Sequence, residues 1–219
     1  MARLARLVVP HHPHHVTQRG NRRADVFFWD ADYQAYLYLL QEWAAAAHTD
    51  IWAYCLMPNH VHLVLVPTVE DGLRATLGET HRRYTRRINK REHCTGHLWQ
   101  ERFHSFPMDE AHLMACVRYI EQNPVRAGLV EKPQDWAWSS ANAHLNGQDD
   151  GTVSVEPMLS RIPDWDVFLK ETQAEEEIMQ LRQHSRTGRP MGDRGWITGL
   201  EKQLGRALSP LKRGPKPRR

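Results

Sequence analysis

The chain has 219 residues, of which 41% are hydrophobic and 25% are charged, a composition typical of a folded protein of one domain with an appendage or of two small domains. No run approaches 18 consecutive apolar residues, so we expect no membrane span, and the first fifteen residues lack the apolar core of a secretory signal. The three cysteines, Cys55, Cys94 and Cys116, are too scattered for a disulfide framework, which favours a reducing cytoplasm as the location.

Positive charge is concentrated towards the C-terminal end. The formal net charge is +3, but residues 186–219 carry ten Lys or Arg against two acidic residues, a net of +8, and the rest of the chain carries a net of −5. A basic tail on a mildly acidic body indicates a polyanionic partner, with nucleic acid the first candidate. The last nine residues, 211–219, are basic and rich in proline, as in a segment that is mobile unless bound.

Strands and helices are predicted in alternation along the first half of the chain. Residues 51–57 and 60–66 flank a Pro58-Asn59 turn, the pattern of a β-hairpin. Pro124 should end the third helix, because the residue before a proline avoids the helical conformation. The predicted strands are residues 14–19, 51–57, 60–66 and 103–108, and the predicted helices are residues 30–48, 71–91 and 109–123.

This order, β-α-β-β-α-β-α, predicts an α+β fold with an antiparallel sheet and helices on one face. Residues 147–151, Gly-Gln-Asp-Asp-Gly, have the composition of a linker. We therefore divide the chain into a domain of residues 1–146 and a C-terminal helical extension of residues 147–219 that ends in the basic tail. Short helices are predicted in the extension at residues 164–170, 174–184 and 193–204.

The histidine pair His60 and His62 is the first candidate for chemistry. Residues two apart on a strand share a face, so the two imidazoles would lie side by side as half of a divalent-metal site. A bare His-x-His pair also arises by chance in a chain with 14 histidines, and His12 and His14 form another. Spacing alone therefore leaves open whether the pair binds a metal.

A second candidate is Tyr119 with Asn123. Four residues apart on a helix, the phenol and the amide would face a common point. A phenol becomes a useful nucleophile only when a base or a metal activates it. The alternative is a half-buried tyrosine on an amphipathic helix that ends at a capping asparagine.

Basic residues cluster on the predicted helix 71–91, where few acidic partners stand four residues away, and this favours phosphate contacts over a surface laced with ion pairs. His93, Cys94, His97 and His104 form a looser group whose spacing matches no zinc motif, so we interpret them as loop residues.

Taken together, these stretches resemble the REP-associated tyrosine transposases, within the HUH group of single-tyrosine transposases. The most specific parts are Met57-Pro58-Asn59-His60-Val61-His62 and Tyr119-Ile120-Glu121-Gln122-Asn123-Pro124. The resemblance covers residues 1 to about 145. It runs through residues 15–21, 53–63, 96–100 and 118–130, with a further likeness at 186–190.

The resemblance implies a ferredoxin-like sheet with the active site on its open face. It implies that His60 and His62 bind Mg²⁺ or Mn²⁺, that Asn123 stands where the third ligand is expected, and that Tyr119 is the nucleophile. The implied activity is transposase-like: a metal-dependent endonuclease and strand transferase that forms a 5′-phosphotyrosine on single-stranded DNA with hairpins from repetitive extragenic palindromes (REPs). The DNA contacts expected are Arg19, Arg22, Arg82, Arg83, Arg86, Arg87, Lys90, Arg126, Arg186, Arg189, Lys212 and Arg213.

Two other functions stay open. The same topology serves sheet-based nucleic-acid binders, so the chain could be a non-catalytic hairpin-binding protein. It could also be a phosphodiesterase that uses water, with Tyr119 merely structural. A monomer and a homodimer are both compatible with the sequence, and a DNA substrate predicts association with the nucleoid.

Overall fold

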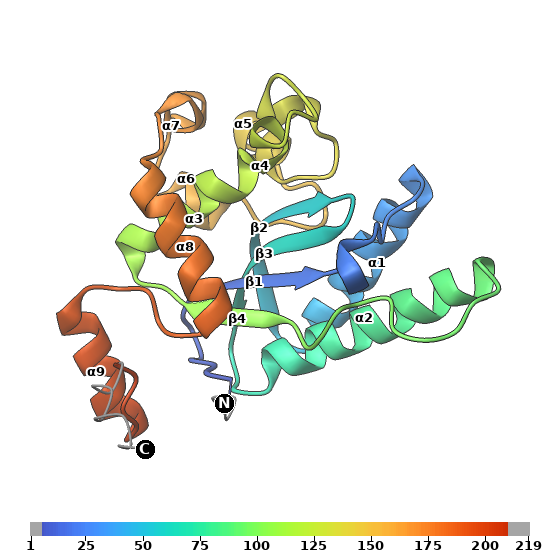
Figure 1. Ribbon diagram of the computed structural model, residues 1–219. Helices are drawn as coiled ribbons and strands as arrows, with labels where there is room; N and C mark the ends of the chain where they lie inside the picture. The colour runs from blue at the N-terminus through green and yellow to red at the C-terminus, as the bar shows by residue number, and fades with distance from the viewer. Residues whose placement is uncertain (1–5, 210–219) are drawn as a thin grey trace, which may run out of the picture.

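The computed structural model describes residues 6–209, and its centre is a four-stranded antiparallel sheet (Figure 1). The strands lie in the order β2-β3-β1-β4, so the first strand is central and pairs with both β3 and β4. This is the ferredoxin-like arrangement expected for a β-α-β-β-α-β chain. The strands are β1 (His14–Arg19), β2 (Thr49–Met57), β3 (His60–Pro67) and β4 (His104–Pro107).

Two long helices, α1 (Asp30–Ala46) and α2 (Gly72–Arg91), cover one face of the sheet. Their apolar sides pack on alternate strand residues such as Val16 and Leu63, which point to this face because side chains on a strand alternate between its two sides. The main chain at the start of α1 is held by Asp32, whose carboxylate accepts hydrogen bonds from the amides of Phe28 and Trp29, the two residues before the helix.

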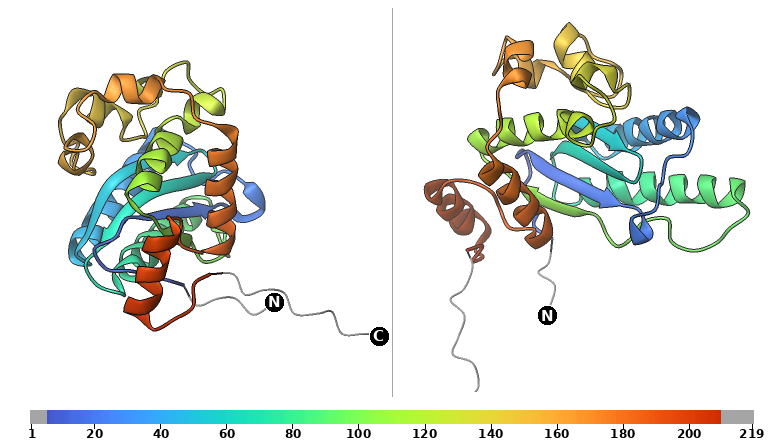
Figure 2. Two further views of the ribbon diagram at one scale, coloured as in Figure 1. Left: turned by 90° about the vertical axis from the view of Figure 1, so that its left-hand side faces the viewer. Right: turned by 45° about the horizontal axis from the view of Figure 1, so that its top comes forward.

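The other face is covered as well, which differs from the expectation of helices on one face only. Helices α3 (Glu110–Glu121) and α8 (Glu175–Thr187) lie across it, as Figure 2 shows from two sides. Strand residues such as Val64 and Phe106 pack beneath them, so the sheet has an apolar core on each side. The α+β class with an antiparallel sheet is confirmed, but the face that carries His60 and His62 is only partly open.

The helix predicted to end near Asn123 in fact ends at Glu121, and a short helix, α4 (Asn123–Arg126), follows at once. Pro124 lies in the first turn of α4, where a missing N–H group costs no hydrogen bond. A proline that was expected to stop a helix therefore also starts one.

Residues 147–151, predicted as a linker, are fixed to the rest of the fold. The Tyr54 hydroxyl on β2 donates a 2.5 Å hydrogen bond to the Asp150 carboxylate, which also accepts from the amides of Thr152 and Val153. Downstream side chains, including Met158 and Leu181, belong to the same apolar core as the strands. The division at residue 146 stays a prediction, but this segment packs as part of the fold. The remaining elements are η1 (Asn21–Arg23), η2 (Pro133–Asp135), α5 (Ala141–Asn146), α6 (Glu156–Leu159), α7 (Trp165–Lys170) and α9 (Arg194–Leu204).

The last described helix closes the molecule against its beginning. Leu200 on α9 and Leu208 form a small apolar cluster with Leu7 and Val9. Residues 186–209 are thus folded, and the basic residues 211–219 lie outside the described part of the chain. Within residues 6–209, none of the helices combines the length and the apolar character that crossing a membrane requires.

Candidate active site

His60 and His62 lie on β3 and point to the face covered by α3. Their ring centroids are 4.9 Å apart, at an angle of 78°. In the sheet, Arg19 on β1 is the partner of His60, and Thr17 is the partner of His62. The side-by-side placement predicted from their spacing is therefore present.

The His60 ring is oriented by its neighbour Asn59. Its Nδ1 lies 2.5 Å from the Asn59 side-chain oxygen, and since an amide oxygen can only accept, Nδ1 must carry the proton and donate. The second nitrogen, Nε2, is then left with a lone pair. Burial, together with the positive charge of Arg19, lowers the pKa of His60 to about 4, so the ring is neutral at physiological pH.

The His62 ring is held by a third histidine, His15 on β1. His15 Nε2 lies 3.0 Å from His62 Nδ1, and the two rings are nearly parallel, at 9°, with centroids 5.2 Å apart. Burial lowers the pKa of His62 well below its ordinary value, and the nearby His60 and His15 lower it further. His15 was not among the predicted site residues, because its contact with His62 depends on the register between β1 and β3.

Tyr119 approaches the histidines from α3. Its ring centroid is 5.6 Å from that of His62 and 6.4 Å from that of His15, in both cases edge-on. The Arg126 guanidinium lies 4.3 Å from the ring centroid and also donates a hydrogen bond to the Tyr119 main-chain oxygen. Among residues 6–209, no side chain or main-chain group hydrogen-bonds to the Tyr119 hydroxyl.

Asn123 is the first residue of α4, directly after the break in the helix. Its side-chain nitrogen is buried and has no hydrogen-bond partner among the described residues. The neighbouring amide of Gln122 is already engaged, because it donates a 2.5 Å hydrogen bond to the main-chain oxygen of Leu169. Asn123 is thus the amide on this stretch that has hydrogen-bonding capacity to spare.

The side chains of His60, His62 and Asn123 have the chemistry of ligands for a divalent metal. The two imidazoles are neutral and lie side by side, and the Asn123 amide can turn its oxygen towards a ligand because its nitrogen is unpaired. Two imidazoles and one amide carry no charge, so a cation held here would keep its full charge for a phosphate. In the described chain, no cluster of three His, Cys, Asp or Glu side chains is placed to bind a metal, and this includes the loop group around Cys94.

Apart from the group on α2, the predicted DNA contacts lie beside the candidate site, near the end of α8, or outside the described residues. Arg19 and Arg126 lie next to the histidines and Tyr119, and Arg22 lies on the exposed η1 turn close behind Arg19. Arg186 is exposed near the end of α8, while the Arg189 guanidinium donates to the main-chain oxygen of Leu208. Lys212 and Arg213 lie outside the described residues.

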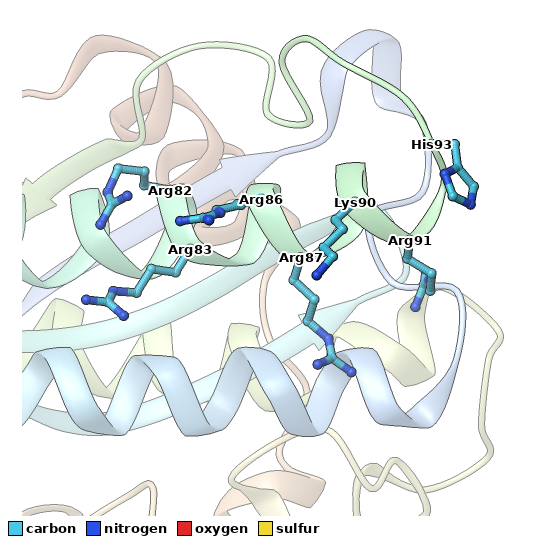
Figure 3. A pocket seen from close by; sticks show the side chains of 7 residues that line it. All are labelled: Arg82, Arg83, Arg86, Arg87, Lys90, Arg91 and His93. Atoms are coloured by element: carbon cyan, nitrogen blue, oxygen red, sulfur yellow. The ribbon is translucent and has the colours of Figure 1, made fainter.

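The largest group of predicted contacts lies away from the tyrosine. A cavity of about 760 Å³ on the surface of α2 is lined only by basic side chains (Figure 3). Of these, Arg82 and Arg83 bond to Glu79, and Arg91 bonds to Asp32. Because α2 and α3 cover opposite faces of the sheet, the structure does not bring this group together with Tyr119. The cavity is lined by Arg82, Arg83, Arg86, Arg87, Lys90, Arg91 and His93.

Comparison with known proteins gives a family and a fold. Residues 8–123, more than half of the chain, match the family model described as "Transposase IS200 like". A Haemophilus influenzae protein whose name places it among the REP-associated tyrosine transposases is 29% identical over 107 residues, which are 44% of this chain and 61% of that protein. The matched part thus spans less than two thirds of this relative.

A solved structure of a REP-associated tyrosine transposase bound to a REP hairpin has a similar fold. The TM-score is 0.58 at 21% sequence identity, and the match covers 70% of this chain and 92% of the other.

Proposed function

The chain belongs to the IS200-like transposase family, and on that ground we propose that it cuts and rejoins single-stranded DNA beside a REP-type hairpin, with Tyr119 as the nucleophile. The observation that carries the proposal is the meeting of Tyr119 with His60 and His62 on one face of the sheet. The likeness to a protein bound to a REP hairpin supports the choice of substrate.

The reaction is a transesterification, in which the phosphoryl group passes from the 3′ oxygen of the DNA to the Tyr119 oxygen and one phosphodiester replaces another. The Tyr119 oxygen attacks the phosphorus, a bond forms between them, and the bond from phosphorus to the 3′ oxygen breaks. The phenol loses one proton and the departing 3′ oxygen gains one, so no proton is consumed. The 5′-phosphotyrosine keeps the energy of the phosphodiester, and the 3′-hydroxyl of the same or another strand can reverse the step without ATP.

His60, His62 and Asn123 are the residues that would hold Mg²⁺ or Mn²⁺. When bound, the cation would supply Lewis-acid polarisation of a non-bridging oxygen of the scissile phosphate. The Arg126 guanidinium orients the tyrosine ring from above by its cation–π contact. Arg19 and Arg126 would also attract the phosphates on either side of the cut.

The basic cavity on α2 would bind DNA backbone on the other side of the molecule. Arg86, Arg87 and Lys90 have no acidic partner among the described residues, so their charges are available to phosphates. A hairpin stem and its flanking single strand could then occupy opposite faces of one monomer, with the basic tail as a further contact.

A denaturing gel with hairpin substrates labelled at the 5′ or the 3′ end tests the proposal. Cleavage with a covalent adduct on the 5′ end of the downstream fragment is expected. Two free fragments would instead indicate hydrolysis by water, and binding without cleavage would indicate a non-catalytic hairpin-binding protein. Either of these results would overturn the role of Tyr119.

A further inference from the structure

His15 is a buried histidine that touches the candidate metal site without belonging to it. It is 1% exposed, its Nε2 lies 3.0 Å from His62 Nδ1, and its Nδ1 lies 3.4 Å from the Ser185 hydroxyl on α8. The edge of the ring packs at right angles against Phe106 on the neighbouring strand. Groups from three elements thus fix this ring on the side of His62 that faces away from His60.

A single proton must lie between the two hydrogen-bonded histidines. His15 Nε2 and His62 Nδ1 lie 3.0 Å apart inside the protein, so one of these two nitrogens carries a proton and the other accepts it in a hydrogen bond. Either His62 Nδ1 donates to His15 Nε2, or the reverse. The first choice leaves a lone pair on His62 Nε2, and the second places a proton there.

The Ser185 hydroxyl can serve either choice, because a hydroxyl both donates and accepts, but only the first choice leaves His62 Nε2 able to bind a cation. If His15 accepts at Nε2, its own proton is on Nδ1, and that N–H can donate to the Ser185 oxygen. Every ring nitrogen of the pair except His62 Nε2 then has a suitable partner. Asn59 produces the same result for His60, whose Nδ1 donates and whose Nε2 is free.

We infer that His15 is a positioning residue that holds His62 with its proton on Nδ1 and its Nε2 lone pair free for a metal. The inference rests on the proposed function, since it assigns a purpose to His15 only if His62 binds a cation. Metal-binding histidines are commonly oriented through their second nitrogen, and loss of such a partner weakens metal affinity by about 10- to 100-fold.

Calorimetric titration of the full-length protein with Mn²⁺ alone tests this role. His15→Leu removes the acceptor and should weaken Mn²⁺ binding by about 10- to 100-fold, whereas His15→Gln offers an amide oxygen and should recover most of the affinity. The matched control is His14→Leu. His14 is equally buried, but it bonds to Val9 and His12 and has no contact with His62, so the affinity should not change.

An unchanged Mn²⁺ affinity in folded His15→Leu would overturn the inference. His62→Ala separates this failure from failure of the proposed site. If His62→Ala loses Mn²⁺ binding and His15→Leu does not, only the role of His15 is wrong. If His62→Ala binds Mn²⁺ as the parent does, the metal site itself is wrong and the role of His15 falls with it.

Nitrogen NMR of the metal-free parent protein, labelled at histidine, provides a test that does not depend on a buried variant folding. We expect the signals that disappear in His62→Ala to show a protonated Nδ1 and an unprotonated Nε2. A proton on His62 Nε2 would overturn the inference.

Discussion

The proposed reaction depends on the hydroxyl of Tyr119 as its nucleophile. Tyr119→Phe should abolish the covalent adduct on a denaturing gel. The ring keeps its contacts with His62 and Arg126, and the hydroxyl has no hydrogen-bond partner in the described chain. The free energy of unfolding should therefore change by less than about 1 kcal/mol. Hairpin binding should be nearly unchanged.

Other tyrosines are poor substitutes for this role. Burial raises the pKa of Tyr36, Tyr54 and Tyr84 well above the ordinary value, which disfavours the nucleophilic phenolate. An undiminished adduct in Tyr119→Phe would nevertheless show that one of the remaining tyrosines is the nucleophile.

The three predicted ligands should differ in their importance. His60→Ala and His62→Ala should each abolish cleavage and weaken Mn²⁺ binding, because each removes an imidazole nitrogen. Asn123→Ala should cost less, roughly tenfold in cleavage rate, because water can replace one neutral oxygen. The cleavage rates are compared at saturating Mn²⁺. Removal of the metal with a chelator should abolish cleavage by the parent protein. Full Mn²⁺ affinity in the double variant of His60 and His62 would refute this site.

For single residues, the sequence predicts contacts between side chains that are close to each other along the chain. The two-residue period of a strand places His60 beside His62, and the helical period places Tyr119 near Asn123, although a break in the helix lies between them. His15 could not be predicted in the same way. Its contact with His62 is diagonal across two strands, and local periodicity does not determine the register between strands.

At the scale of elements, α3 is the part whose position matters most, because it carries Tyr119. Its last residue, Glu121, is fully buried and accepts hydrogen bonds from Ser140, His144 and Trp165, at 2.6, 2.6 and 2.8 Å. Ser140 and His144 belong to the start and the body of α5, and Trp165 belongs to α7, so one carboxylate joins α3 to both of these helices.

Glu121→Ala should lower the free energy of unfolding by about 3 kcal/mol, because it removes the shared acceptor of three buried donors. Denaturant unfolding measures this loss. Glu110→Ala is the control from the other end of the same helix. Glu110 is exposed and pairs with Arg161, so its loss should cost less than about 1 kcal/mol. Equal effects of the two substitutions would contradict the role given to Glu121.

Most elements were predictable because their signals are local. The Pro58-Asn59 hairpin, helices α1 and α2 and the three C-terminal helices lie within a few residues of the predicted ranges. The errors occur where tertiary contacts decide the outcome. Residues 147–151 have the composition of a linker, but Tyr54 fixes Asp150, and α3 and α8 cover a face that was expected to be open.

At the scale of the whole molecule, positive charge on α2 and the candidate active site lie on opposite faces. Replacing Arg86, Arg87 and Lys90 by Gln should weaken hairpin binding and make the dependence of log affinity on log salt less steep by about 2 to 3 units. Cleavage of a saturating substrate should persist. Replacing Lys132, Lys170 and Lys202 by Gln removes the same charge elsewhere, and equal salt slopes in the two variants would contradict a specific role for α2.

Buried histidines make stability depend on pH. The pKa values of His14 and His15 are lowered to about 3, and that of His62 lies well below the ordinary value, in each case chiefly by burial. Below pH 6.5 the unfolded chain therefore binds protons that the folded chain does not, and stability falls as the pH falls.

Between pH 7 and pH 5.5 the loss should be about 1 kcal/mol for each of these three histidines, measured by denaturant unfolding. Equal stability of the parent at the two pH values would contradict the prediction.

The apolar cluster that joins Leu7 and Val9 to Leu200 and Leu208 has a consequence for biosynthesis. Leu7 and Val9 pack against residues that follow them in the sequence by most of the described chain. A chain emerging from the ribosome can form the β2–β3 hairpin early, because both strands and their turn are neighbours in sequence. It must carry an uncovered apolar segment at Leu7 and Val9 until α9 has been synthesised, so this part of the fold is completed only after the sheet and its other helices are available.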